Sequence, residues 1–221
     1  MKARVLCLHG YSMNGAWLKE WLQPIELALE EQTVFFYPDA PISCNAEEVK
    51  KVWRSLNMSL PAYRLGAGKN FCWYRATDST PPTYREIENS FAAISKLIAK
   101  DGPFDGVIAW SQGAMLAAIL LAMSEHSEDT DYGFKWAVLG AGAKPSDPRF
   151  LEYIEQGIST PTLQILGNKE PKAILARYHD LCNVFTRGQQ LITPVGHVFP
   201  FRQPSYMARI STWIKVQIDN R

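Results

Sequence analysis

The chain has 221 residues, of which 47% are hydrophobic and 20% are charged, a composition typical of an ordinary globular protein. Its 23 basic and 22 acidic residues leave a formal charge of +1 and form no run of one sign, so we expect no nucleic-acid partner. No apolar stretch approaches the roughly 20 residues of a membrane span, and the four cysteines lack zinc-binding or disulfide spacing. We therefore expect a reduced, cytoplasmic protein with no stable membrane insertion and no metal.

Short apolar runs alternate along the chain with longer amphipathic stretches, as in a parallel sheet whose strands are joined by crossover helices. This pattern predicts a single α/β domain over residues 1–221, with a mostly parallel six-stranded sheet and helices on both of its faces. The predicted strands are residues 4–8, 33–37, 106–110, 136–140, 162–166 and 190–194. The predicted helices are residues 14–31, 46–56, 83–100, 112–126, 147–156, 171–183 and 203–218.

Three local features refine these elements. Thr83 and Glu86 have the spacing of a capping box, so the helix over residues 83–100 is expected to begin there. Pro24 predicts a break or kink in the first helix. Residues 42–82 are rich in proline, glycine and aromatic residues and are long for a plain connection, so we expect them to form a lid or pocket wall.

The strand over residues 106–110 runs into Ser111, and small residues then open a helix. Residues 109–113 read A-x-S-x-G, which is typical of a nucleophile elbow, the sharp strand-to-helix turn that presents a catalytic serine above a sheet edge. Ala109 stands where this pattern usually has its first glycine, and it is still small. A serine that only caps a helix is the alternative interpretation. We predict that Ser111 is the nucleophile.

Two backbone N–H groups are expected to form an oxyanion hole beside Ser111. A strand that ends in His-Gly commonly begins a loop that donates one N–H, here that of Tyr11, and the residue after the serine, Gln112, would donate the other. His9 precedes the nucleophile in the chain, so we expect it to shape this loop and not to act as the base.

The base and the acid should follow the last two strands if the chain order is serine, acid, histidine. His197 follows the last predicted strand and is the candidate base. Glu170 is the one carboxylate in the loop after residues 162–166, and we expect it to orient the histidine, although it could instead face a helix N-terminus. Asp147 is the alternative acid, although Asp147-Pro148 also has the pattern of a helix cap.

Three aromatic residues are candidates for the substrate site. Trp73 and Tyr74 lie in the irregular segment and Trp110 ends the strand before the serine, although such side chains more often belong to the core. His126 and His179 lie on predicted helices among charged residues and are expected at the surface.

Together these motifs resemble those of the FSH family of serine hydrolases, which belongs to the α/β-hydrolases, over nearly the whole chain. The matching stretches are Leu6-Cys7-Leu8-His9-Gly10-Tyr11, Asp39-Ala40-Pro41, Trp73-Tyr74, Gly102-Pro103-Phe104-Asp105-Gly106-Val107, Ser111-Gln112-Gly113-Ala114 and Gly196-His197 with Pro200. The resemblance implies an α/β-hydrolase fold with Ser111 as nucleophile and His197 as base. The chain departs from the family at Ala109, where glycine is usual, and at Glu170, where the loop normally carries aspartate.

The residues and the resemblance predict a serine hydrolase that cleaves a carboxylic ester or thioester through an acyl-enzyme, without a cofactor. The resemblance favours a small-molecule substrate with a medium or long acyl chain. An acyl-protein thioesterase is the alternative among enzymes, and a catalytically weakened, hydrolase-fold ligand-binding protein is the alternative outside them. The sequence does not predict the oligomeric state.

Overall fold

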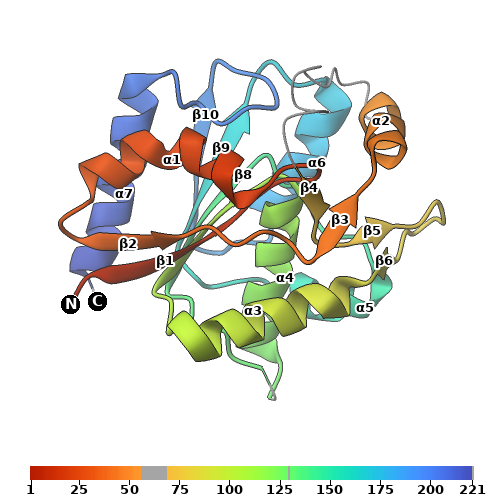
Figure 1. The fold of residues 1–221 in the computed structure, drawn as a ribbon, viewed down its shortest axis with the longest axis horizontal. Coiled ribbons are helices and arrows are strands. Elements are labelled where there is room, and N and C mark those ends of the chain that lie inside the picture. The colour runs from red at the N-terminus through yellow and green to blue at the C-terminus, as the bar shows by residue number, and fades with distance from the viewer. Residues whose placement is uncertain (56–68, 129, 221) are drawn as a thin grey trace.

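The computed structural model describes residues 1–55, 69–128 and 130–220, which are built around one six-stranded sheet (Figure 1). Its strand order is β10-β9-β8-β7-β1-β2, and every neighbouring pair is parallel. The strands are β1 (Ala3–Leu8), β2 (Thr33–Phe36), β7 (Gly106–Trp110), β8 (Trp136–Gly140), β9 (Thr162–Gly167) and β10 (Gly188–Thr193). Each predicted strand is confirmed, with ends that agree or differ by one or two residues.

Helices cover both faces of the sheet, as predicted (Figure 1). Along β1, Leu6 and Leu8 face a core shared with α3 (Ile87–Asp101), α4 (Gln112–His126) and α5 (Pro148–Glu155). The alternate residues Val5 and Cys7 face a second core shared with α1 (Gly15–Ala28) and α7 (Pro204–Asp219). A further helix, α6 (Lys172–Cys182), contributes to both cores. Burial on both faces explains why the central strands β7 and β8 are almost entirely apolar, whereas the edge strand β10 is mostly exposed and carries polar residues.

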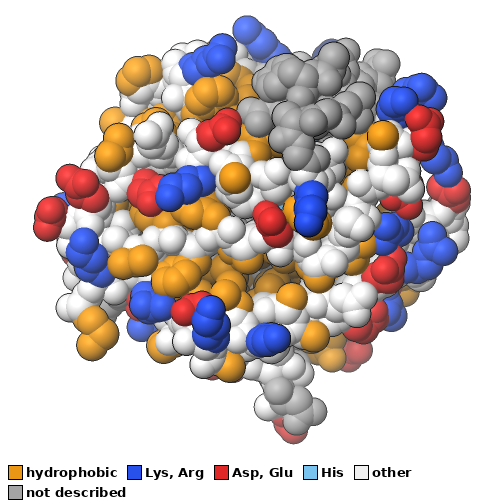
Figure 2. Space-filling view, in the orientation of Figure 1, with side chains coloured by type: hydrophobic (Ala, Val, Ile, Leu, Met, Phe, Trp, Pro, Cys, Tyr) orange, Lys and Arg blue, Asp and Glu red, His pale blue; other side chains and the backbone are white. Residues whose placement is uncertain are grey.

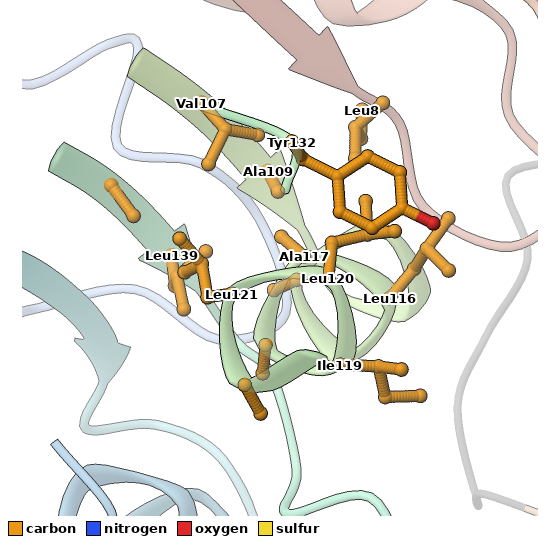
Figure 3. Close-up of a cluster of buried hydrophobic side chains, with 14 of the residues drawn as sticks. Leu8, Val107, Ala109, Leu116, Ala117, Ile119, Leu120, Leu121, Tyr132 and Leu139 are labelled. Atoms are coloured by element: carbon orange, nitrogen blue, oxygen red, sulfur yellow. The ribbon is translucent and has the colours of Figure 1, made fainter. Parts of the chain in front are cut away.

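The helix α4 is buried nearly all round, with apolar side chains against β1, β7 and β8 (Figure 3). Gly113 lies in its first turn, and a Cβ atom there would lie 2.4 Å from the carbonyl oxygen of Leu8 and 2.6 Å from that of His9. Because both atoms belong to the backbone, only glycine lets the start of α4 lie directly against the end of β1. This contact places the turn at Ser111 beside the loop that follows β1.

Two sequence predictions about helices are wrong. Tyr84 and Arg85 form a short strand, β6 (Tyr84–Arg85), which pairs with β5 (Arg75–Ala76), so α3 begins only at Ile87 and no capping box forms. Glu86, with φ of 63°, makes no side-chain cap. The helix α1 is continuous through Pro24, which lies on its exposed face, so the predicted break is wrong, and a kink at this residue stays a prediction.

The predicted lid contains β3 (Ile42–Cys44), α2 (Ala46–Ser55) and β4 (Asn70–Cys72), and β3 pairs with β4 in an antiparallel ribbon. Residues 56–68 of this segment lie outside the described part of the chain, so its role as a lid stays a prediction. On the face drawn in Figure 2, basic and acidic side chains are interspersed, in keeping with the balanced charge of the sequence. No helix in the described ranges is both long and apolar enough to cross a membrane.

Candidate active site

Ser111 lies at the turn between β7 and α4 with an unusual backbone conformation. Its φ is 53° and its ψ is −115°, a region that non-glycine residues seldom adopt, and its N–H donates to the carbonyl oxygen of Gly140 at 2.7 Å. Such strain persists where the surrounding structure holds the residue in place. The serine side chain makes no cap hydrogen bond to α4, which contradicts the alternative in which this serine is only a helix cap.

Three side chains from three loops form a continuous hydrogen-bonded chain. The Oγ atom of Ser111 lies 2.9 Å from Nε2 of His197, and Nδ1 of the same ring lies 2.8 Å from Oε1 of Glu170. These residues follow β7, β10 and β9, whose carboxyl ends share one edge of the sheet. The carboxylate side chain is only 3% exposed and the imidazole is 16% exposed. The arrangement can remove a proton from the serine while a buried anion faces the opposite ring nitrogen.

The loop after β9 and the loop after β10 are held directly against each other. The N–H of Lys169 donates to the carbonyl oxygen of Val195 at 3.1 Å. A Cβ atom at Gly167 would lie 2.5 Å from the carbonyl oxygens of both Val195 and Gly196, so this approach requires glycine. The spacing between the carboxylate and the imidazole is therefore set by backbone contacts as well as by the side chains.

A fourth side chain joins this group, and the sequence did not reveal it. Tyr178 on α6 donates its hydroxyl to Oε1 of Glu170 at 3.2 Å, and the hydroxyl oxygen of Tyr178 lies 2.9 Å from Nδ1 of His197. The residue is 3% exposed, and burial together with the negative charge of Glu170 raises the pKa of the Tyr178 phenol, which keeps it protonated. The available signal was its position in the second turn of a helix that begins two residues after Glu170.

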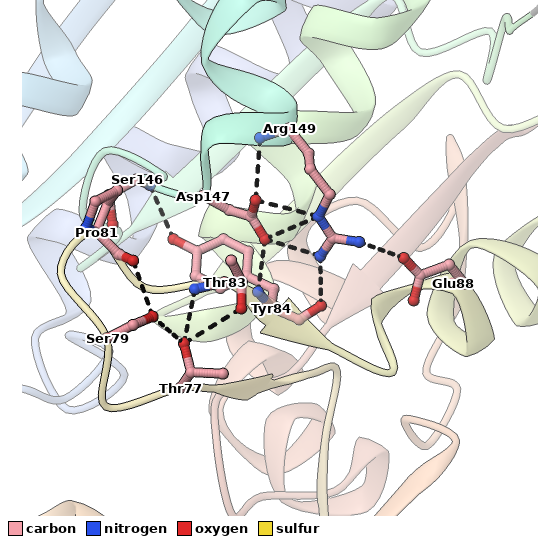
Figure 4. Close-up of polar contacts among 9 residues, drawn as sticks. All are labelled: Thr77, Ser79, Pro81, Thr83, Tyr84, Glu88, Ser146, Asp147 and Arg149. Carbon is pink, nitrogen blue, oxygen red and sulfur yellow. Dashed lines mark hydrogen bonds and ion pairs between the residues drawn. The ribbon is translucent and has the colours of Figure 1, made fainter.

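Asp147, the alternative acid, forms hydrogen bonds with Tyr84 and Arg149 and not with His197 (Figure 4). Its buried carboxylate accepts from the N–H of Tyr84 at 2.5 Å and from the N–H and Nη2 of Arg149 at 3.0 and 2.8 Å. Burial disfavours the charged carboxylate, but these hydrogen bonds and the Arg149 charge outweigh it, so the pKa of Asp147 is lowered. It caps α5, as the sequence indicated, and Arg149 extends the network to Glu88 at 2.6 Å.

His9 ties the loop after β1 to the loop after β2. Its ring is fully buried, Nε2 accepts from the N–H of Ala40 at 3.0 Å, and Nδ1 lies 2.8 Å from the carbonyl oxygen of Gly10. Burial lowers the pKa of His9 to about 4, so it is neutral and its Nδ1–H donates to that carbonyl. The expected architectural role agrees with these contacts. His126, expected at the surface, is instead half-buried, with Nε2 2.6 Å from the carbonyl oxygen of Gly157.

The two candidate oxyanion donors lie close to the serine. A Cβ atom at Gly10 would lie 3.3 Å from Cβ of Ser111, so the loop that carries Tyr11 runs directly beside the serine. The Tyr11 N–H makes no backbone hydrogen bond within the described ranges. Gln112 is the first residue of α4, where N–H groups have no partner inside the helix. Neither N–H group has a backbone acceptor among the described residues, and their role as oxyanion donors stays a prediction.

Trp73, Tyr74 and Trp110 are all buried, with 1%, 3% and 2% of their surface exposed. The Gln112 side chain accepts from the N–H of Trp73 at 2.9 Å and donates to the carbonyl oxygen of Tyr74 at 2.8 Å. The Trp73 indole donates to the carbonyl oxygen of His9 at 2.8 Å, and the Trp110 ring lies 5.7 Å from the imidazole of the site. These contacts favour a supporting role over the predicted substrate-lining role, which stays a prediction.

A cavity of about 290 Å³ lies between the loop after β8, α5 and α6. Its lining consists of Lys144, Pro145, Ser146, Leu151, Arg177 and Asp180. The charged members suit a polar group better than an acyl chain. Across the described ranges, no three histidine, cysteine or acidic side chains gather as metal ligands would, and the four cysteines are free.

The parallel sheet, the strained serine after β7 and the histidine after β10 define an α/β-hydrolase. Solved structures share this fold. Maize acyl-protein thioesterase 2 matches with a TM-score of 0.64 and 20% identity, and the match covers 98% of this chain and 94% of that chain. A Bacillus cereus carboxylesterase matches with a TM-score of 0.57 and 17% identity, and the match covers 98% of this chain and 89% of that chain. The sequence model of the serine hydrolase (FSH1) family matches residues 1–208, and the chain belongs to that family.

Curated relatives of the chain include two proteins named as esterases. Zebrafish esterase OVCA2 is 26% identical over 206 residues, which cover 89% of this chain and 90% of that protein. Drosophila melanogaster esterase CG5412 is 27% identical over 200 residues, which cover 90% of this chain and 69% of that protein. A Schizosaccharomyces pombe protein named dihydrofolate reductase is 27% identical over 208 residues, and the match spans only 44% of its length.

Proposed function

We propose that this serine hydrolase cleaves carboxylic esters or thioesters through an acyl-enzyme on Ser111. The observation that carries the proposal is the hydrogen-bonded chain from Ser111 Oγ through His197 to Glu170, at 2.9 and 2.8 Å. Both distances are within the range for direct proton transfer and orientation. The family membership and the esterase names of two relatives support the same reaction class.

In the proposed reaction, His197 Nε2 accepts the proton of Ser111 as Oγ attacks the acyl carbon. The imidazolium then gives that proton to the leaving alcohol or thiol, and the acyl group remains on the serine. A water molecule, deprotonated by the same nitrogen, then attacks the acyl carbon. The bond from that carbon to Ser111 Oγ breaks, the carboxylic acid leaves, and the imidazolium returns the proton to Oγ. Glu170 holds the proton on Nδ1 throughout and stabilises the positive charge on the ring.

The N–H groups of Tyr11 and Gln112 are the proposed donors to the oxyanion. They act where negative charge develops on the carbonyl oxygen, and one such donor typically contributes about 10²–10³ in kcat. Because the donors are backbone groups, their position depends on the loop contacts at His9 and Gly113 described above.

The proposed substrate is a small molecule with a medium or long acyl chain. A thioester of an acylated protein is the alternative substrate, and maize acyl-protein thioesterase 2 supports it only through its shared fold. A panel of p-nitrophenyl esters that differ in acyl length, run beside acyl thioesters of the same lengths, distinguishes these possibilities. A preference for acetate over all longer chains would contradict the proposed chain length.

Labelling with a fluorophosphonate probe tests the proposal, since an activated serine reacts rapidly with it. We expect the wild-type protein to be labelled and to lose ester turnover in proportion. Ser111→Ala should remove both activities while circular dichroism and the melting temperature show an intact fold. Ser127→Ala, at the opposite end of α4, is the matched control and should be labelled as the wild type is. A folded wild-type protein that resists the probe would favour a ligand-binding protein instead.

A further inference from the structure

Tyr178 completes a triangle of polar atoms with the two residues that lie behind the serine. Its hydroxyl oxygen lies 2.9 Å from His197 Nδ1 and 3.2 Å from Glu170 Oε1, and the third side of the triangle is 2.8 Å. The side chain comes from α6, which is separate from the loops that carry the other two groups. It is nearly fully buried, so water does not compete for these hydrogen bonds.

We propose that Tyr178 is a positioning residue that stabilises the imidazolium of His197 by bridging it to Glu170. This inference rests on the proposed function, because it assigns a further part to the same site. The phenol can serve both neighbours at once, since its proton points to the carboxylate and an oxygen lone pair faces the Nδ1–H. The proton on Nδ1 then has two acceptors, one charged and one neutral.

The charges around the tyrosine determine which way the phenol acts. Burial and the Glu170 charge raise the pKa of Tyr178, and the opposing effect of the nearby Arg177 guanidinium is smaller, so the group stays a neutral donor. Its hydrogen bond to Oε1 restrains the long glutamate side chain, which has three rotatable bonds to the carboxylate. Its oxygen end faces the ring N–H, and this dipole favours a positive ring over a neutral one.

The Tyr178 hydroxyl therefore stabilises the protonated His197 ring, which forms only during catalysis. Substrate binding leaves the imidazole neutral, whereas attack by the serine makes it positive, so the phenol stabilises the transition state more than the ground state. Loss of the hydroxyl should lower kcat and leave KM nearly unchanged. A residue that only filled space behind the histidine would change stability without this kinetic pattern.

Tyr178→Phe is the test, because it removes one oxygen and keeps the ring that packs in the core. We expect kcat for a p-nitrophenyl ester to fall by about ten- to a hundredfold, the contribution of one hydrogen bond to a charged group, while KM changes by less than about twofold. The acid limb of the kcat/KM profile should move to lower pH by about one to two units, the same free energy expressed as a pH shift. Tyr132→Phe, a buried tyrosine beside α4, is the matched control and should leave both measurements unchanged (Figure 3).

A second measurement does not depend on turnover. The protonation of the His197 ring is followed by NMR in protein with isotope-labelled histidine, and the signal is assigned with His197→Asn. The midpoint should lie at lower pH in Tyr178→Phe than in the wild type. An unchanged midpoint, or a loss of kcat without any shift, overturns the inference. Failure of fluorophosphonate labelling would overturn the proposed function but not this inference. The NMR midpoint needs no reactive serine, so the two failures can be told apart.

Discussion

The charge of Glu170 should matter more for catalysis than any other feature of the loop after β9. Its Oε1 lies 2.8 Å from His197 Nδ1, and with the charges spread over both groups their centres are about 4 Å apart. At an effective dielectric constant of about 20, a unit charge at that separation stabilises an imidazolium by about 4 kcal/mol. Glu170→Gln keeps the shape and removes this charge, so kcat should fall by roughly a thousandfold.

The assay is steady-state hydrolysis of a p-nitrophenyl ester, with the fold checked by circular dichroism. Glu170→Asp keeps the charge but is shorter by one methylene, so it should lose less, about tenfold if the loop moves to close the gap. Asp147→Asn is the matched control, because it neutralises a buried carboxylate that contacts Arg149 and Tyr84 instead of the imidazole. It should lower the free energy of unfolding by about 2–4 kcal/mol and leave kcat unchanged. The reasoning is refuted if Glu170→Gln turns over substrate as the wild type does, or if Asp147→Asn abolishes turnover.

Two further predictions concern the loops that support the site. The pKa of His9 is about 4 in the folded protein and about 6.5 in the unfolded chain, so its contribution to stability is complete above pH 6.5 and is lost as the pH falls toward 4. The free energy of unfolding measured with urea should therefore be about 2 kcal/mol lower at pH 5 than at pH 7. Equal values would exclude a buried neutral ring. Gly167→Ala should lower kcat and cost about 1–3 kcal/mol of stability, because its Cβ meets the backbone of the histidine loop, whereas Gly196→Ala, with open space around its Cβ, should do neither. Equal losses in both glycine variants would show that the loop contact is not what matters.

The sequence was most informative where a residue's environment follows from its place in a strand. Apolar runs predicted the four central strands β9, β8, β7 and β1 because these parallel strands are buried on both faces, whereas the edge strands β10 and β2 are partly exposed. The order of the elements also predicted that the loops carrying Ser111, Glu170 and His197 would lie at one edge of the sheet, and the structure brings these three side chains together. Chain order alone does not separate Glu170 from Asp147, because both lie between Ser111 and His197, and it was the position of Glu170 after the strand that precedes the histidine strand that favoured it.

Local patterns misled where a distant residue competes for the same backbone group. Thr83 and Glu86 have capping-box spacing, but the strand pairing of β6 with β5 and the bond from Tyr84 N–H to Asp147 hold that stretch extended. No local pattern near Thr83 predicts the contact with the carboxylate of Asp147, which lies more than sixty residues later in the chain. Pro24 failed as a break signal for a related reason, because packing of the buried face of α1 outweighs one lost helical hydrogen bond.

Glutamate in place of the usual aspartate requires compensation in the surrounding structure. A longer side chain reaches the same ring nitrogen only if its loop lies further back or its carboxylate is held by another group. The second condition is met here, since Tyr178 holds Oε1 from α6, while Gly167 lets the two loops touch through their backbones. The departure at Glu170 and the unforeseen tyrosine are therefore two parts of one arrangement, and restoring aspartate alone should leave the phenol without its acceptor.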